Sequence, residues 1–175
     1  MAGVTVIPNP MASVVQLFGD GSHPTTRLAR TALVETLAHR RGARVLDVGT
    51  GTGILARVAL EAGAGEVVGI DHAPQAIETA RSLVPGARFH LTDAADYLFQ
   101  FAGGAFDVVV ANLANPPLVA LLPDLAAAAR LGGILLITGL HLFEADAAMA
   151  ALRDAGARPA PPRADAGWCL IAADC

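Results

Sequence analysis

Short apolar runs alternate with amphipathic segments along most of the chain. The apolar runs predict six strands of the kind that is buried on both faces of a sheet. They span residues 44–49, 66–71, 87–93, 106–112, 132–139 and 168–173. The other segments have helical periodicity. They predict helices over residues 25–38, 53–62, 74–83, 118–130 and 144–154.

This alternation predicts an α/β fold with a doubly wound, mostly parallel sheet of the Rossmann-like type, because parallel strands need crossover helices between them. Pro159, Pro161 and Pro162 interrupt the pattern before the last strand. They favour a connection that turns the chain and lets the last strand run antiparallel. No internal repeat or clear linker is present. We therefore expect one domain over residues 18–175, preceded by an N-terminal arm over residues 1–17.

Composition narrows the functional classes. Hydrophobic residues make up 54% of the 175 residues, but no run of about 20 apolar residues is present, so we expect no membrane span. Residues 1–17 lack a basic start and contain two prolines, which argues against a signal peptide. The two cysteines, Cys169 and Cys175, lack metal-ligand spacing, so we expect no metal site. The net charge of −4 argues against a nucleic-acid partner. These features favour a cytoplasmic protein and leave its oligomeric state open.

The loop after the first predicted strand has three glycines at alternate positions behind an acid, in the segment Asp47-Val-Gly49-Thr-Gly51-Thr-Gly53. A nicotinamide dinucleotide loop needs the spacing G-x-G-x-x-G, which would place its third glycine at Ile54 or Ala56. The fit to a nicotinamide cofactor is therefore poor. The spacing D-x-G-x-G-x-G instead resembles the first motif of class I S-adenosylmethionine-dependent methyltransferases.

That resemblance implies roles for several acids and glycines. The backbone at Gly49 and Gly51 would approach the methionine part of the cofactor, and Asp47 would help to hold its ammonium group, directly or through water. Asp71 ends the second predicted strand, where a carboxylate can accept hydrogen bonds from both ribose hydroxyls. Asp93, after the third strand, would contact the adenine amino group. The simpler alternatives are a tight turn without a ligand for the glycines and a helix cap for Asp93.

Two further segments are more specific. "FGDGSHPTTRLA" (residues 18–29) is similar to the F-G-T-G-x-H-x-T-T segment of the ribosomal protein L11 methyltransferase family, and "DVVVANLANPPL" (residues 107–118) to its D-V-V-V-A-N-I-L-A-N-P-L segment. The ending "GWCLIAA" resembles the last strand of that family. The resemblance covers residues 18–173 and implies an S-adenosylmethionine-dependent methyltransferase. Its cofactor contacts would be Thr26, Gly49, Asp71 and Asn112.

Asn112 is the candidate catalytic residue. The resemblance places it at the end of the fourth strand, facing the methyl group, where it could accept a hydrogen bond from a substrate amine and direct the nitrogen lone pair. The alternative is that Asn112 only stabilises its loop. His23, His141 and Glu144 lie near predicted element ends on the ligand side and could assist deprotonation of the amine. A solvated loop position is the simpler interpretation of each of these three.

The chain also departs from the family pattern. Asp20 replaces a threonine, Glu144 falls where the family tends to carry glutamine, and residues 112–115 are one residue shorter than the family's N-I-L-A-N. Only about 17 residues precede Phe18, where the family has a separate domain that recognises the ribosomal protein. We therefore predict N-methylation of an amine on a small molecule or on a protein side chain.

Two further alternatives stay open. The chain could be a non-catalytic subunit that binds S-adenosylmethionine for a partner. Asn115-Pro116-Pro117 also resembles the N-P-P-Y loop of enzymes that methylate amide or exocyclic amino nitrogens. However, Leu118 stands where that loop has an aromatic residue.

Overall fold

The computed structural model describes residues 21–114 and 117–175, so the predicted arm over residues 1–17 lies outside the described part. The strands are β1 (Arg44–Val48), β2 (Glu66–Asp71), β3 (Arg88–Leu91), β4 (Phe106–Asn112), β5 (Ala129–His141), β6 (Arg158–Pro159), β7 (Arg163–Asp165) and β8 (Trp168–Asp174). The helices are α2 (Pro24–Ala38), α3 (Ile54–Glu61), α4 (Pro74–Leu83), α5 (Ala94–Phe99), α6 (Pro117–Ala128), the 3₁₀ turn η1 (Leu142–Glu144) and α7 (Ala145–Asp154).

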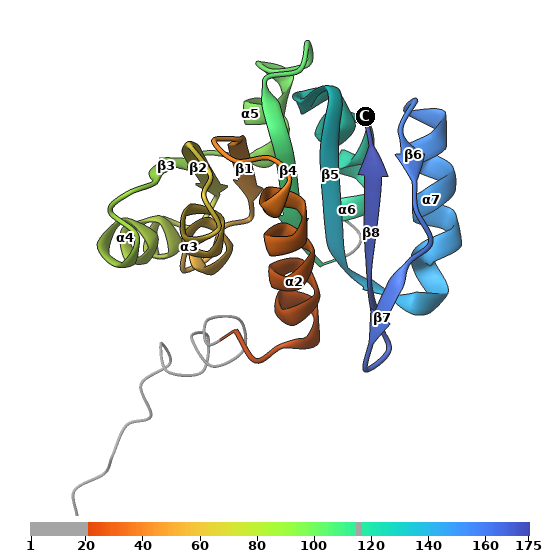
Figure 1. Ribbon diagram of the computed structural model, residues 1–175, viewed down its shortest axis with the longest axis horizontal. Coiled ribbons are helices and arrows are strands. Elements are labelled where there is room, and N and C mark those ends of the chain that lie inside the picture. The colour runs from red at the N-terminus through yellow and green to blue at the C-terminus, as the bar shows by residue number, and fades with distance from the viewer. Residues whose placement is uncertain (1–20, 115–116) are drawn as a thin grey trace, which may run out of the picture.

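The strands form one sheet in the order β3-β2-β1-β4-β5-β8-β6, and β7 also pairs with β8 (Figure 1). Strands β1 to β5 run parallel, whereas β8 runs antiparallel to β5. This is the doubly wound Rossmann-like sheet with an antiparallel C-terminal strand that the sequence predicts. In the described part of the chain, no helix is long and apolar enough to span a membrane.

The sheet separates two apolar cores, because successive strand residues point to opposite faces. On one face, Val45 and Val108 pack against the helices α2, α3 and α4. On the other face, Leu46 and Val109 pack against α5, α6 and α7. The two-sided burial explains why the strands read as continuous apolar runs with no polar alternation.

Four elements differ from the sequence prediction. Helix α5 has six residues, too few for helical periodicity to be detected. Strands β6 and β7 have two and three residues, and they exist because β8 offers a backbone with which to pair. The helix expected over residues 118–130 ends at Ala128, and β5 begins directly at Ala129. Short elements of this kind depend on their neighbours in space.

The parallel arrangement brings the carboxyl ends of β1 to β5 to one edge of the sheet. Figure 1 shows the start of α2 and the turn between β7 and β8 at that same edge, at the bottom of the view. In open α/β sheets, ligands bind outside the carboxyl ends of the strands. The candidate site is therefore built at this edge.

Candidate active site

The glycine loop between β1 and α3 is held tightly against β2. Gly49, Gly51 and Gly53 have φ angles of 72°, 55° and 81°, which only glycine adopts without strain. The backbone N–H groups of Gly49 and Thr50 both donate to the carbonyl oxygen of Ile70, each at 2.9 Å. A Cβ added to Gly49 would lie 2.2 Å from Cδ2 of Leu113. Alternate glycines are thus needed for both the turn and the close approach of the β4 loop.

Asp47 is buried beneath this loop, with 1% of its surface exposed. Oγ1 of Thr50 donates to Oδ2 of Asp47 at 2.7 Å. Burial raises the pKa of Asp47 to about 6, against the opposing effect of hydrogen bonds from Thr50 and the Ala56 backbone, and the nearby charge of Asp71 adds to the rise. A buried acid with a raised pKa at a ligand-binding edge is typical of a functional position.

Asp71 connects two loops at the end of β2. Its Oδ2 accepts from the Gly51 N–H at 3.0 Å, and its Oδ1 accepts from the Ala73 N–H at 2.9 Å. Its side chain is only 11% exposed, and Nδ1 of His72 lies 3.6 Å from Oδ1. Asp71 therefore positions the glycine loop and faces the same space as that loop.

A cavity of about 400 Å³ opens beside Gly49 and Asp71. Its lining comprises Gly49, Ile70, Asp71, His72, Thr92, Asp93, Ala94, Leu113, Pro117, Ala120 and Leu121. Pockets for small molecules and cofactors have about this volume and combine apolar walls with a few polar groups. The structure thus brings three of the predicted residues, Gly49, Asp71 and Asp93, to one cavity.

Asp93 has a structural role as well as a place at the cavity. It is exposed, it is the N-cap of α5, and its Oδ1 accepts from the Ala95 N–H at 2.8 Å. The helix-cap alternative from the sequence is therefore present in the structure. The second oxygen of the carboxylate makes no hydrogen bond among the contacts of the described residues, so a contact with adenine stays a prediction.

Thr26 and Asn112 meet although 86 positions separate them in the sequence. Nδ2 of Asn112 lies 3.5 Å from Oγ1 of Thr26, which is 2% exposed. Asn112 ends β4 and Thr26 lies in the first turn of α2, so the contact joins the sheet to the leading helix. His23 caps that helix, with its Nδ1 2.8 Å from Oγ1 of Thr25. The start of α2 therefore has both predicted roles: His23 caps the helix, and Thr26 contacts the candidate catalytic residue Asn112.

An aromatic cluster lies beyond His23 at the same edge. The Trp168 ring stacks on His141 with ring centroids 4.0 Å apart, and the His23 ring meets Trp168 edge to face at 5.1 Å. His141 also stacks on Phe143, which is 84% exposed. Sequence reasoning identified His23 and His141 separately and used Trp168 only as a strand marker. The register of β5 with β8, which pairs His141 with Trp168, is what brings these rings together.

Glu144, the third candidate helper, is engaged in its own turn. Its Oε2 accepts from the His141 backbone N–H at 2.8 Å, in the reciprocal hydrogen-bond pattern that starts η1. This bond supports the end of β5, where the His141 ring is held. The carboxylate of Glu144 therefore has a structural role, because it fixes the backbone of His141.

The chain is similar to known proteins over nearly its whole length, including all the site residues described above. The family model described as ribosomal protein L11 methyltransferase matches residues 16–174. The chain belongs to the ribosomal protein L11 methyltransferase family. This confirms the family predicted from the "FGDGSHPTTRLA" and "DVVVANLANPPL" segments.

Curated members of the family are similar over most of this chain. The ribosomal protein L11 methyltransferase of Methylobacillus flagellatus is 40% identical over 170 residues, which cover 94% of this chain and 56% of the relative. The protein of the same name from Thiobacillus denitrificans is 42% identical over 152 residues, covering 86% and 49%. The chain thus spans about half the length of the curated relatives it matches.

Solved structures agree on the fold. The ribosomal protein L11 methylase of Lactobacillus delbrueckii subsp. bulgaricus superposes with a TM-score of 0.71 at 25% identity, covering 82% of this chain and 77% of that one. An S-adenosylmethionine-dependent methyltransferase from Mesorhizobium loti gives a TM-score of 0.66 at 18% identity and covers 83% and 96%. The second similarity concerns the fold alone. Family and fold together support S-adenosylmethionine over a nicotinamide cofactor, as the spacing of the glycines predicts.

Proposed function

We propose that this chain is an S-adenosylmethionine-dependent methyltransferase that methylates an amine nitrogen. The observation that carries the proposal is the cavity of about 400 Å³ between the Gly49 loop and the β2 end, with the carboxylate of Asp71 at its wall. Membership of the L11 methyltransferase family supports the same conclusion.

Three residues predicted to contact S-adenosylmethionine, Gly49, Asp71 and Asp93, line this cavity and support the proposal. Asp71 and Asp93 both line the cavity, which supports the predicted contacts of Asp71 with the ribose hydroxyls and of Asp93 with the adenine amino group. Gly49 lets the side chain of Leu113 pack directly against the loop, and both residues line the cavity. When bound, S-adenosylmethionine supplies an activated methyl group on its sulfonium.

The methionine part would lie over the glycine loop. There we expect the backbone of Gly51 to approach it and Thr26, in the first turn of α2, to contact it. Asp47 is buried under the loop, so we expect its charge to act on the cofactor ammonium through the loop or a water. The raised pKa of Asp47 reflects the cost of keeping that charge in a buried position.

Asn112 would orient the acceptor. Its side-chain oxygen can accept a hydrogen bond from the amine, while its Nδ2 is directed to Oγ1 of Thr26. An amine of lysine type must lose a proton first, which costs about 4–5 kcal/mol at pH 7 for a pKa of about 10.4. A half-buried site lowers that cost because it destabilises the ammonium form. Most of the rate acceleration then comes from alignment and from the exclusion of water.

The relatives' name directs the choice of the first acceptor to test, an amine of ribosomal protein L11. An amine-bearing small molecule is the alternative acceptor. The non-catalytic alternative is not favoured, because the family match runs through Asn112 and the whole cofactor edge. A cytoplasmic location stays a prediction from the sequence.

The decisive test starts with calorimetric titrations of S-adenosylmethionine, S-adenosylhomocysteine and NAD. We expect the two sulfur nucleosides to bind and NAD not to bind, and Asp71→Ala to abolish binding. Methyl transfer is then measured from labelled S-adenosylmethionine to ribosomal protein L11 of Thiobacillus denitrificans and to an amine-containing metabolite fraction. Binding of NAD alone would overturn the cofactor assignment. Cofactor binding without label in either acceptor would overturn the proposed N-methylation.

A further inference from the structure

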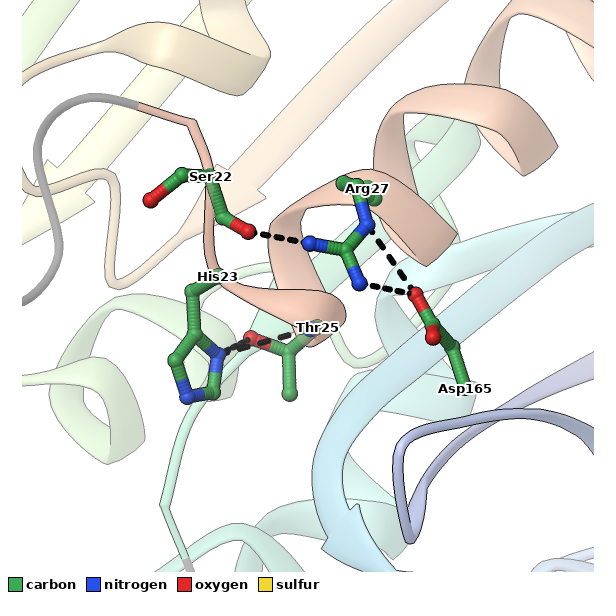
Figure 2. A network of polar contacts seen from close by, with 5 residues as sticks. All are labelled: Ser22, His23, Thr25, Arg27 and Asp165. Atoms are coloured by element: carbon green, nitrogen blue, oxygen red, sulfur yellow. Dashed lines mark hydrogen bonds and ion pairs between the residues drawn. The ribbon is translucent and has the colours of Figure 1, made fainter.

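Arg27 connects three segments around the start of α2 (Figure 2). Its Nη1 donates to the backbone carbonyl of Ser22, in the segment that leads into the helix. Its Nε and Nη2 both donate to Oδ2 of Asp165, at 3.0 and 2.6 Å. Asp165 ends β7, so one guanidinium holds the entry to α2 against a strand 138 positions away.

Asp165 lies directly opposite Trp168 in the hairpin formed by β7 and β8. The two residues of the turn between them, Ala166 and Gly167, have φ angles of 48° and 83°. Ala166 is the one residue other than glycine with a positive φ in the described part of the chain. A non-glycine residue persists in that conformation only where its surroundings hold it. The hairpin tip is thus under strain beside the Arg27–Asp165 contact.

Trp168 in turn lies between two candidate site residues. Its ring stacks on that of His141 and makes an edge-to-face contact with the ring of His23, the cap of α2. These contacts form a closed ring: Arg27 of α2 binds Asp165, Asp165 pairs with Trp168 across the hairpin, and Trp168 contacts His23 at the start of α2. The same first turn of α2 carries Thr26, which contacts Asn112.

The exposure of the ion pair argues against a role in global stability. The side chains of Arg27 and Asp165 are 51% and 34% exposed, and exposed pairs of this kind contribute little to stability. Yet Arg27 uses three donors on two partners, more than a simple surface pair requires. The arrangement is suited to fixing a local geometry.

We propose that Arg27 and Asp165 are positioning residues for the acceptor side of the site. Their contact holds the β7–β8 hairpin so that Trp168 stays between His23 and His141, next to the first turn of α2 from which Thr26 reaches Asn112. This inference deepens the proposed function and rests on it for the meaning of the site. The positioning itself is measurable without any acceptor.

The chain provides a matched control in a second ion pair between the same two elements. Nη1 of Arg163, in β7, lies 2.5 Å from Oε2 of Glu35, in α2, and the side chains are 55% and 52% exposed. Glu35 lies two helical turns beyond Arg27, away from the carboxyl edge of the sheet. Removing the Arg163–Glu35 ion pair should therefore perturb the same helix–strand interface without changing the surroundings of Trp168.

The experiment uses the single tryptophan of the chain as the probe. Acrylamide quenching and near-ultraviolet circular dichroism of Trp168 are compared in the wild type, Asp165→Asn, Arg27→Gln, the double variant and Arg163→Gln. An exposed ion pair shifts a local equilibrium by about two- to five-fold. We therefore expect the quenching constant to rise about two-fold in both single site variants and to stay unchanged in Arg163→Gln.

The double variant tests whether the two residues act as one contact. We expect its quenching constant to match that of either single variant, because both remove the same interaction. Additive effects would mean that Arg27 and Asp165 act separately, which overturns the proposal. An equal effect of Arg163→Gln would overturn it too, since the pair would then be one of two general ties between α2 and β7.

Methyl transfer supplies the functional readout. With ribosomal protein L11 as acceptor, we expect the acceptor KM to rise about two- to five-fold in Asp165→Asn while the KM for S-adenosylmethionine is unchanged. A changed Trp168 signal with no methylation by the wild type would mean that the proposed function fails and the positioning stands. Methylation by the wild type, with neither the Trp168 signal nor the acceptor KM changed in Asp165→Asn or Arg27→Gln, would mean that the proposed function stands and the positioning role is wrong.

Discussion

Asp47→Asn offers a direct test of what the buried acid contributes. The substitution keeps the shape of the side chain and removes its charge. Burial raises the pKa of Asp47 from an ordinary 3.8 to about 6. Carrying the charge at pH 7 therefore costs the folded state about 3 kcal/mol, since each pKa unit corresponds to about 1.4 kcal/mol.

The sign follows from proton linkage. Between the unfolded and folded pKa values, the folded protein holds a proton on Asp47 that the unfolded chain has lost, so stability falls as pH rises. The contribution is fully present below the unfolded value and is lost once pH passes about 6. We expect the stability of the wild type relative to Asp47→Asn to fall by about 2 kcal/mol between about pH 4.5 and about pH 7.5.

At pH 7 the variant should be the more stable protein, by about 1–2 kcal/mol. The amide cannot accept from both Thr50 and the Ala56 backbone as the carboxylate does, and the loss of one hydrogen bond offsets about 1 kcal/mol of the gain. We expect the same variant to bind S-adenosylhomocysteine about ten-fold more weakly, because the buried charge serves the ligand. Higher stability with weaker binding is the pattern of a functional residue.

The assay is urea unfolding of both proteins across this pH range, with calorimetric titration of S-adenosylhomocysteine at each pH. The difference between the two unfolding free energies isolates the residue, because all other titrating groups are common to both proteins. Parallel pH profiles would refute the raised pKa. A variant with unchanged affinity for S-adenosylhomocysteine would refute the functional reason for burying the charge.

Other positions give separate tests. Asn112→Ala should slow methyl transfer by about 100-fold while S-adenosylhomocysteine affinity falls less than about ten-fold, and equal losses would make it a cofactor residue only. Gly49→Ala should weaken that affinity more than Gly51→Ala, because both positions have positive φ but only at Gly49 does a Cβ meet Leu113. Asp107→Asn should lower the unfolding free energy by about 1–2 kcal/mol and leave cofactor affinity unchanged, since this acid binds the Arg44 N–H and Arg130 at the opposite edge. A changed affinity in calorimetry would show that the two edges are coupled.

Local sequence patterns were sufficient for most of the fold. Continuous apolar strands and amphipathic helices follow from burial on both faces of a sheet, so the six strands and five helices could be read directly from the sequence. The glycines at alternate positions after Asp47 predicted the tight turn between β1 and α3, because only glycine takes the positive φ angles found there without strain. Short elements such as α5 and β7 left no such pattern, because they depend on neighbours supplied by distant segments.

The candidate site, too, was predicted from the sequence only in part. The identity of Asp71 as a strand-end acid was visible in the sequence, whereas its two hydrogen bonds to the Gly51 and Ala73 backbones required the folded loops. The contact of Asn112 with Thr26 and the stacking of Trp168 on His141 join residues that are 86 and 27 positions apart. No local pattern encodes such pairs. They arise because β4, β5 and β8 lie side by side and α2 crosses their face, which is a property of the tertiary structure alone.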